Sequence, residues 1–152
     1  MSDVTFRLAE DKDLAAIVAL LADDEFAENR EQASPGAAEG YAQAFAAMQG
    51  EHFNKMLLAE QDGQVVGALQ LVFVPGLSRK GTKRAIIESV RVASRLRGHA
   101  IGTALMKEAI RRAREGGCGL VQLTSDKRRT RAHLFYRRLG FEQSHFGFKK
   151  EL

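Results

Sequence analysis

The stretch that decides the fold spans residues 86–103 and reads IIESVRVASRLRGHAIGT. Its beginning is rich in β-branched apolar residues, which is typical of a strand, predicted here over residues 85–92. A short basic loop follows. Three small residues, Gly98, Ala100 and Gly102, then open an amphipathic pattern that predicts a helix over residues 98–115. The stretch therefore predicts a strand, a loop and a helix whose first turn carries little side-chain bulk.

The start of that helix is a candidate anion site. The first turn of any helix has amide N–H groups without partners inside the helix, and the helix dipole places partial positive charge there. Small residues at this turn leave room for a phosphate group. No Gly-Lys-Ser/Thr follows, so the segment is not a P-loop, and its spacing differs from the dinucleotide-binding fingerprint. The alternative is an ordinary helix start with glycines for close packing.

Regular elements are predicted on both sides of this stretch. Asp11 is expected to cap a first helix, the acidic residues 23–36 to form a loop, and Asp62-Gly63 to turn a hairpin. Strands are predicted over residues 4–8, 55–60, 64–74 and 120–123, with one or two weaker ones in 141–152, and further helices over 37–49 and 129–139. This order predicts an α/β sandwich that forms one domain over residues 1–152.

Length and composition limit the class of protein. A chain of 152 residues with 45% hydrophobic and 28% charged residues suits one globular domain that buries its own core. A single cysteine, Cys118, excludes an intramolecular disulfide and a cysteine-based zinc cluster. No apolar run reaches the length of a membrane span and no signal peptide is recognisable, so a cytoplasmic protein without membrane contact is expected.

Charge is divided unevenly along the chain. Residues 1–76 carry 4 Lys/Arg against 13 Asp/Glu, whereas residues 77–152 carry 19 against 6. A basic second half suggests an anionic partner, and nucleic acid, a membrane surface and a polyphosphate cofactor all satisfy that requirement. The alternative is that most of these basic side chains lie on solvated helix faces.

A second motif narrows the choice among these anionic partners. Residues 131–141 read RAHLFYRRLGF, a helix ended by glycine and followed by an apolar residue. With the segment 97–102, RGHAIG, it makes the sequence resemble the GNAT superfamily of acyl-CoA-dependent N-acyltransferases. The first segment is similar to the family's pyrophosphate loop, Arg/Gln-x-x-Gly/Ala-x-Gly/Ala. The second is similar to its Ala-x-x-Phe-Tyr-x-x-x-Gly-Phe block.

The resemblance implies a fold and a cofactor. The fold is a mixed, mostly antiparallel sheet of six or seven strands flanked by about four helices. The co-substrate is acetyl-CoA, with its pantetheine arm along the backbones of Val90 and Val92. Arg129 stands where many members have Asn, and we expect it to reach a CoA phosphate instead. The remaining cofactor-binding residues implied by the resemblance form the pyrophosphate loop: Arg97, Gly98, His99, Ala100, Gly102 and Thr103.

Two residues are candidates for proton transfer. Tyr136 matches the tyrosine that commonly protonates the departing CoA thiolate in the family, and its alternative role is a core aromatic beside Phe135. By strand alternation Glu88 is expected to share the cleft-lining face with Val90 and Val92, which makes it the candidate base. The alternative for Glu88 is a structural salt bridge with Arg91 or Arg84. No histidine has metal-ligand spacing, and no metal site is predicted.

The expected function is direct acetyl transfer from acetyl-CoA to a small primary amine. The alternatives are an acyl-CoA sensor without catalysis and a basic nucleic-acid-binding module; no nucleic-acid partner is expected, because helix-turn-helix and single-strand-binding signals are absent. Acidic residues between 23 and 31 (Asp23, Asp24, Glu25, Glu28 and Glu31) are expected to form a rim that attracts a cationic acceptor, or else a solvated loop. The oligomeric state stays open between a monomer and the homodimer common in the family.

Overall fold

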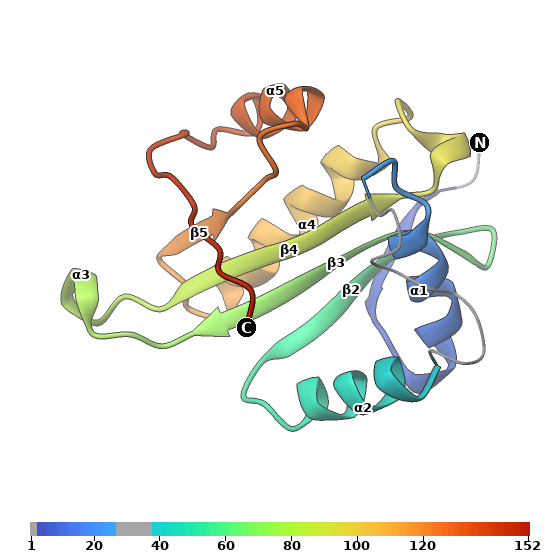
Figure 1. Ribbon diagram of the computed structural model, residues 1–152, viewed down its shortest axis with the longest axis horizontal. Helices are drawn as coiled ribbons and strands as arrows, with labels where there is room; N and C mark the ends of the chain where they lie inside the picture. Colours follow the sequence, from blue (N-terminus) through green and yellow to red (C-terminus); the bar gives the residue numbers. More distant parts are fainter. Residues whose placement is uncertain (1–2, 27–37) are drawn as a thin grey trace. The chain divides into compact units, whose positions relative to one another are not determined.

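The computed structural model describes residues 3–26 and 38–152, and the chain divides into two compact units, residues 1–122 and 123–152. The first unit is built on a sheet with the strand order β1-β2-β3-β4-β5 (Figure 1). Its strands are β1 (Thr5–Leu8), β2 (Asn54–Gln61), β3 (Gln64–Val74), β4 (Arg84–Val92) and β5 (Leu120–Leu123). The three pairings from β1 to β4 are antiparallel, as expected.

Helices of the first unit cover both faces of the sheet. Helix α1 (Leu14–Ala22) and helix α2 (Ala38–Gln49) pack on one face, where Ile17 and Leu20 join Met56, Leu58 and Ala68 in a buried cluster. Helix α4 (Ile101–Glu115) packs on the other face. There a Cβ on Gly67 would lie 3.5 Å from Ile101 Cγ2. Figure 1 shows α4 behind the strands.

Two predicted helix starts are wrong. The turn before α1 is a 3-10 turn, Asp11–Asp13, and Asp13 rather than Asp11 accepts the Glu10 amide, at 2.7 Å. Helix α4 begins at Ile101, not at residue 98, because the backbone of Gly98 and Ala100 is left-handed, with φ of 85° and 64°. Left-handed backbone cannot continue into a right-handed helix, so the loop extends three residues further.

The basic loop after β3 contains one turn, α3 (Ser78–Gly81), in which Arg79 and Lys80 also have left-handed backbone. A second short turn, η3 (Ser94–Leu96), follows β4. Among the described residues, no helix is both long and apolar enough to cross a lipid bilayer.

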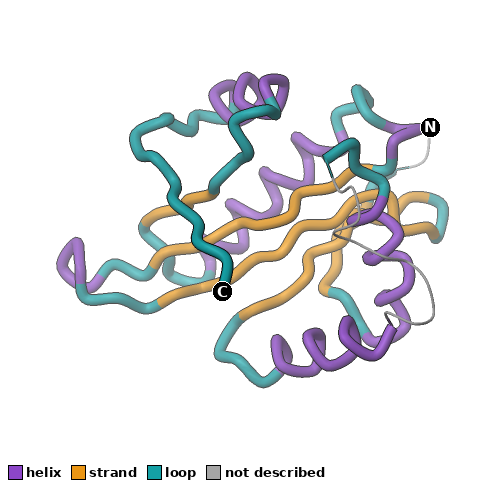
Figure 2. Tube along the Cα trace, viewed as in Figure 1, coloured by secondary structure: helices purple, strands orange, loops and turns teal. Residues whose placement is uncertain are grey.

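The second unit contains helix α5 (Thr130–Arg138). The residues that follow α5 to the end of the chain are drawn as loop in Figure 2. The prediction of one or two strands over residues 141–152 is therefore wrong, and the described sheet has five strands instead of six or seven. Phe146 and Phe148 are 89% and 94% exposed. Because the segment buries no apolar face, nothing offsets the entropy cost of ordering it as a strand.

Candidate active site

A β-bulge in β4 shapes the centre of the first unit. Gln70 on β3 pairs with Glu88, and Ala68 pairs with Arg91, so two residues of β4 stand opposite the single Leu69. Within the bulge Ser89 has a left-handed backbone, with φ of 54°. An extra residue reverses the alternation of side chains along the strand beyond it.

The bulge corrects the expected placement of Glu88. Glu88 and Arg91 pair with residues on the β3 face that packs against α1 and α2, whereas Val92 pairs with Gly67 on the α4 face. Simple alternation predicted that Glu88 and Val92 share one face of the sheet. The bulge places them on opposite faces instead. The carboxylate of Glu88 faces the side of the sheet where α1 and α2 lie.

Glu88 is exposed and, within the described parts of the chain, forms no ion pair. The two arginines proposed as alternative partners are bonded elsewhere. Arg84 donates to Gln122 Oε1 at 2.9 Å and to Ser78 Oγ at 2.8 Å. Arg91 pairs with Asp24, with 3.4 Å between Nη2 and Oδ2. The salt-bridge alternative for Glu88 is therefore not found.

A pocket of about 160 Å³ opens on the same face of the sheet. Its walls are mainly apolar, and polar groups come from Gln70, Ser89 and Tyr41. The apolar lining residues, from α1, α2 and β2, are Leu14, Ile17, Val18, Leu21, Ala44, Phe45, Met48 and Met56. Neither Gln70 nor Ser89 was predicted as a site residue, because only the pairing of β3 with β4 and the bulge bring them to the pocket.

The loop between β4 and α4 presents a row of amide donors. Five backbone N–H groups between positions 98 and 103 find no hydrogen-bond acceptor in the described chain: those of Gly98, Ala100, Ile101, Gly102 and Thr103. Left-handed residues next to right-handed ones turn successive N–H groups toward one concave surface, which suits an anion. The space beside Gly98 is open, because a Cβ added there would meet no atom within 4 Å.

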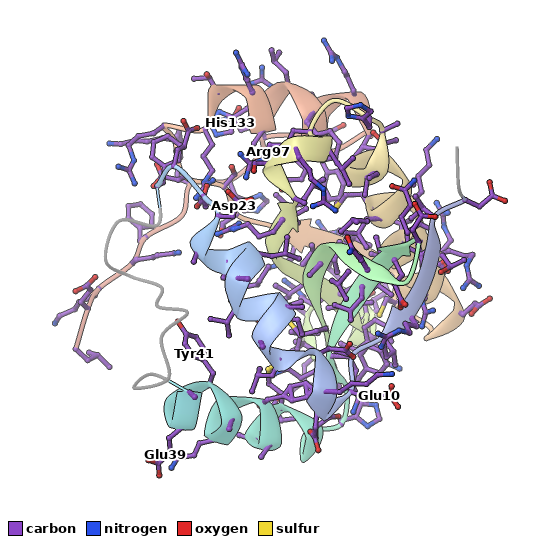
Figure 3. All side chains as sticks on the ribbon, turned by 90° about the vertical axis from the view of Figure 1, so that its right-hand side faces the viewer. Glu10, Asp23, Glu39, Tyr41, Arg97 and His133 are labelled. Carbon is purple, nitrogen blue, oxygen red and sulfur yellow. The ribbon has the colours of Figure 1, made fainter. Side chains whose placement is uncertain are left out.

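The side chains of Arg97 and His99 are engaged with the protein itself. Arg97 Nη2 donates to the backbone oxygen of Asp23 at 2.6 Å, and Figure 3 shows these two residues beside one another at the end of α1. His99 Nδ1 lies 3.1 Å from the Leu96 carbonyl oxygen. Both side chains therefore stabilise the loop, and its backbone amides are the donors that could receive an anion.

The first two residues of the expected acidic rim, Asp23 and Asp24, are bonded within the protein instead of facing a substrate. Asp23 Oδ2 accepts the Ser94 amide at 3.0 Å, and this bond, together with nearby Arg97, lowers the pKa of Asp23. The Asp24 side chain is only 6% exposed and pairs with Arg91. Of the rim residues in the described chain, only Glu25 is exposed; Glu28 and Glu31 lie outside the described residues.

Tyr136 and Arg129 belong to the second unit. The Tyr136 ring lies 5.2 Å from the Phe135 ring and 6.0 Å from the Phe141 ring, between centroids, and the residue is half-buried. Arg129 precedes α5, and its amide donates to the Asp126 oxygen at 2.9 Å. Hydrogen bonds from Arg128 lower the pKa of Asp126. The aromatic packing holds the Tyr136 ring in place within this unit.

Comparison with known proteins identifies relatives over most of the chain. The model of the acetyltransferase (GNAT) family matches residues 14–141. An aminoalkylphosphonate N-acetyltransferase of Salmonella typhimurium is 39% identical over 95 residues, which are 62% of this chain. The matched part spans only 61% of that relative's own length.

Two solved structures resemble the chain along almost its whole length. One, described as a transcriptional regulator from Bacillus halodurans C-125, is 41% identical with a TM-score of 0.95, covering 99% of this chain and 100% of that one. The other, an acetyltransferase of Trypanosoma brucei, is 25% identical with a TM-score of 0.81, covering 99% and 100%. The family match confirms the expected family and, with it, acetyl-CoA as the acetyl donor that this family uses. The chain belongs to the acetyltransferase (GNAT) family.

Proposed function

We propose that this protein transfers an acetyl group from acetyl-CoA directly to a small primary amine. The observation that carries the proposal is the set of five amides at the start of α4 for which the described residues offer no acceptor. These amides lie in the segment that resembles the family's pyrophosphate loop. Amides at a helix N-terminus suit a pyrophosphate, because each donates a hydrogen bond and the helix dipole adds positive potential.

The residues that would hold acetyl-CoA follow from the same resemblance. The amides from Arg97 to Thr103 would bind the pyrophosphate, and the backbones of Val90 and Val92 would bind the pantetheine arm. The bulge at Ser89 supports this role, because it disturbs the regular pairing of β4 beside Val90. The resemblance also assigns Arg129 to a phosphate of CoA.

Two side chains would move protons. Glu88 would accept the proton that an ammonium group must lose before its nitrogen attacks the thioester, and it has no arginine partner among the described residues to prevent this. Tyr136 would donate its hydroxyl proton to the thiolate that leaves. The nitrogen–carbon bond forms as the carbon–sulfur bond breaks. The ammonium nitrogen loses two protons in all: the first goes to Glu88 before the attack, and the second, lost once nitrogen has bonded to carbon, replaces the proton that Tyr136 gives to sulfur.

The acceptor is a small amine with an aliphatic part. The pocket lined by Gln70, the register partner of Glu88, has about 160 Å³ and mainly apolar walls, which suits a short carbon chain. The relative from Salmonella typhimurium acts on aminoalkylphosphonates, so these are the first compounds to test.

A turnover screen tests the proposal. Free CoA thiol is measured with acetyl-CoA and, separately, aminoalkylphosphonates, amino acids, polyamines, aminoglycosides and peptides. We expect turnover with at least one small aliphatic amine. CoA binding without turnover of any amine would favour the acyl-CoA sensor.

A nucleic-acid-binding function has one observation in its favour: the 41%-identical structure is described as a transcriptional regulator. The basic second half of the chain is compatible with such a role. A DNA titration at two salt concentrations separates the two functions, since binding through phosphates weakens steeply with salt. Specific binding to DNA together with no acetyl transfer would replace the proposed function by this one.

A further inference from the structure

A chain of three polar side chains leads from the surface to the pocket. Asn54 Nδ2 donates to Glu51 Oε2 at 3.0 Å, and Gln70 Nε2 donates to Asn54 Oδ1 at 2.8 Å. Asn54 is only 8% exposed, and apart from Asp13 it is the buried polar residue of the described chain. We call these three residues, Glu51, Asn54 and Gln70, the amide relay.

The chemistry of Glu51 sets the direction of every bond in the relay. An ionised carboxylate only accepts hydrogen bonds, so Asn54 must turn its NH₂ group toward Glu51. The Asn54 oxygen then faces Gln70, and Gln70 must in turn present its NH₂ group to that oxygen. The Gln70 side-chain oxygen, Oε1, is consequently the end of the amide that is left for another partner.

Gln70 lines the pocket and is the register partner of Glu88 on the neighbouring strand. Directly paired residues of antiparallel strands have Cβ atoms roughly 5 Å apart and share one face of the sheet. A polar end in a mainly apolar pocket fixes the orientation of a ligand. An oxygen acceptor beside a carboxylate is complementary to a group with several N–H donors.

Resting on the proposed function, we propose that Gln70 is the residue that positions the acceptor amine. Its Oε1 accepts one N–H of the primary amine while the Glu88 carboxylate accepts another, and the aliphatic part of the substrate lies against the apolar walls. The exposed Glu51 acts at a distance, by fixing which end of the Gln70 amide meets the substrate. The relay thus selects a primary amine over a ligand that offers only acceptors.

The first variant removes the acceptor. Gln70→Met keeps a similar length but has no amide oxygen, and the amine in the test is the best acceptor of the turnover screen. We expect the KM for the amine to rise, and kcat/KM to fall, on the order of tenfold or more, the usual effect of losing a hydrogen bond to a charged group. The KM for acetyl-CoA should remain unchanged, which a general loss of structure would not allow.

The second variant reverses the relay without touching the pocket. In Glu51→Lys the ammonium group donates to the Asn54 oxygen, so Asn54 and then Gln70 turn over and Gln70 presents its NH₂ group to the amine. We expect a rise in the KM for the amine comparable with that of Gln70→Met. Glu39→Lys, an exposed position on α2, makes the same change of charge outside the relay and should leave this KM unchanged.

A third variant restores the direction. In Glu51→Lys/Asn54→Asp the introduced carboxylate accepts from both the introduced ammonium group and the Gln70 NH₂ group. Gln70 Oε1 then faces the substrate again, and we expect the KM to recover. A folded Gln70→Met or Glu51→Lys protein with an unchanged KM for the amine would overturn the inference while acetyl transfer stands. A wild-type chain that acetylates no amine would overturn the proposed function, and this inference with it.

Discussion

Arg91 on β4 and Asp24, just beyond α1, form an ion pair with both side chains largely buried, 13% and 6% exposed. The pair joins the end of α1 to the strand that carries the bulge. A buried charge that loses its partner is costly, so this carboxylate has a structural task that its acidic sequence context did not indicate.

Asp24→Asn should therefore lower the free energy of unfolding by roughly 3 kcal/mol, because the buried Arg91 guanidinium loses a charged partner. Urea unfolding measures the change. Glu25→Gln, at an exposed neighbouring position, should stay within about 0.5 kcal/mol of wild type. If Asp24→Asn had unchanged stability but a weaker preference for a diamine over a neutral alkylamine, Asp24 would instead attract the cationic acceptor, as the acidic rim proposed.

The amides at the start of α4 are the proposed pyrophosphate site, so a larger, negatively charged side chain introduced there should prevent CoA from binding. Gly102→Glu should abolish CoA binding, since a carboxylate would occupy the space of the pyrophosphate and repel it. Calorimetry with CoA measures binding, and circular dichroism verifies that the variant is folded. Lys107→Gln, an exposed position on α4 with the same change of charge, should bind normally. Unaltered binding in folded Gly102→Glu would place the cofactor elsewhere.

Ala100 has a left-handed backbone that costs a non-glycine residue about 1 kcal/mol. Ala100→Gly should therefore raise the free energy of unfolding by up to about 1 kcal/mol, because the relief of strain exceeds the added entropy of the unfolded chain. The same substitution four residues later, Ala104→Gly, should lower it by about 1 kcal/mol, since that residue lies within α4. Urea unfolding of both variants tests the contrast, which fails if the two changes have the same sign.

Asp13 should contribute to stability in a pH-dependent way. Hydrogen bonds from Arg7 lower the pKa of Asp13 to about 2, from an unfolded value near 3.8. The stabilisation is complete above the unfolded pKa and is lost as the pH falls from about 4 to about 2, a change of roughly 2 kcal/mol. Urea midpoints of wild type and Asp13→Asn should differ at pH 6 and converge near pH 2. Parallel curves over that range would contradict the assignment.

The two proposed proton-transfer residues predict a loss of turnover without a loss of CoA binding. Glu88→Gln and Tyr136→Phe should each lower kcat on the order of 10²-fold or more, the usual contribution of a positioned base or acid. Steady-state kinetics measures kcat, and CoA affinity serves as the control. Full activity of Tyr136→Phe would mean that water protonates the thiolate, and full activity of Glu88→Gln would remove that residue from the reaction.

The sequence alone determined the features that depend on short-range chemistry. Asp62-Gly63 predicted a hairpin, and both residues have the positive φ that such a turn requires. The periodicity of residues 101–113 predicted α4, and two spaced motifs predicted the family that the comparison confirms. Each of these signals lies within a few neighbouring residues, because backbone geometry and side-chain periodicity are local properties.

Only the tertiary structure decided the features that depend on a partner distant in the chain. The bulge at Ser89 exists only as a mismatch between β4 and β3, and it overturned the face on which Glu88 was expected. Whether Asp24 attracts a substrate or binds Arg91 depends on a contact across 67 positions. The amide relay also needs the register of β2 with β3. A sequence lists the groups that can pair, but burial and register determine which pairs form.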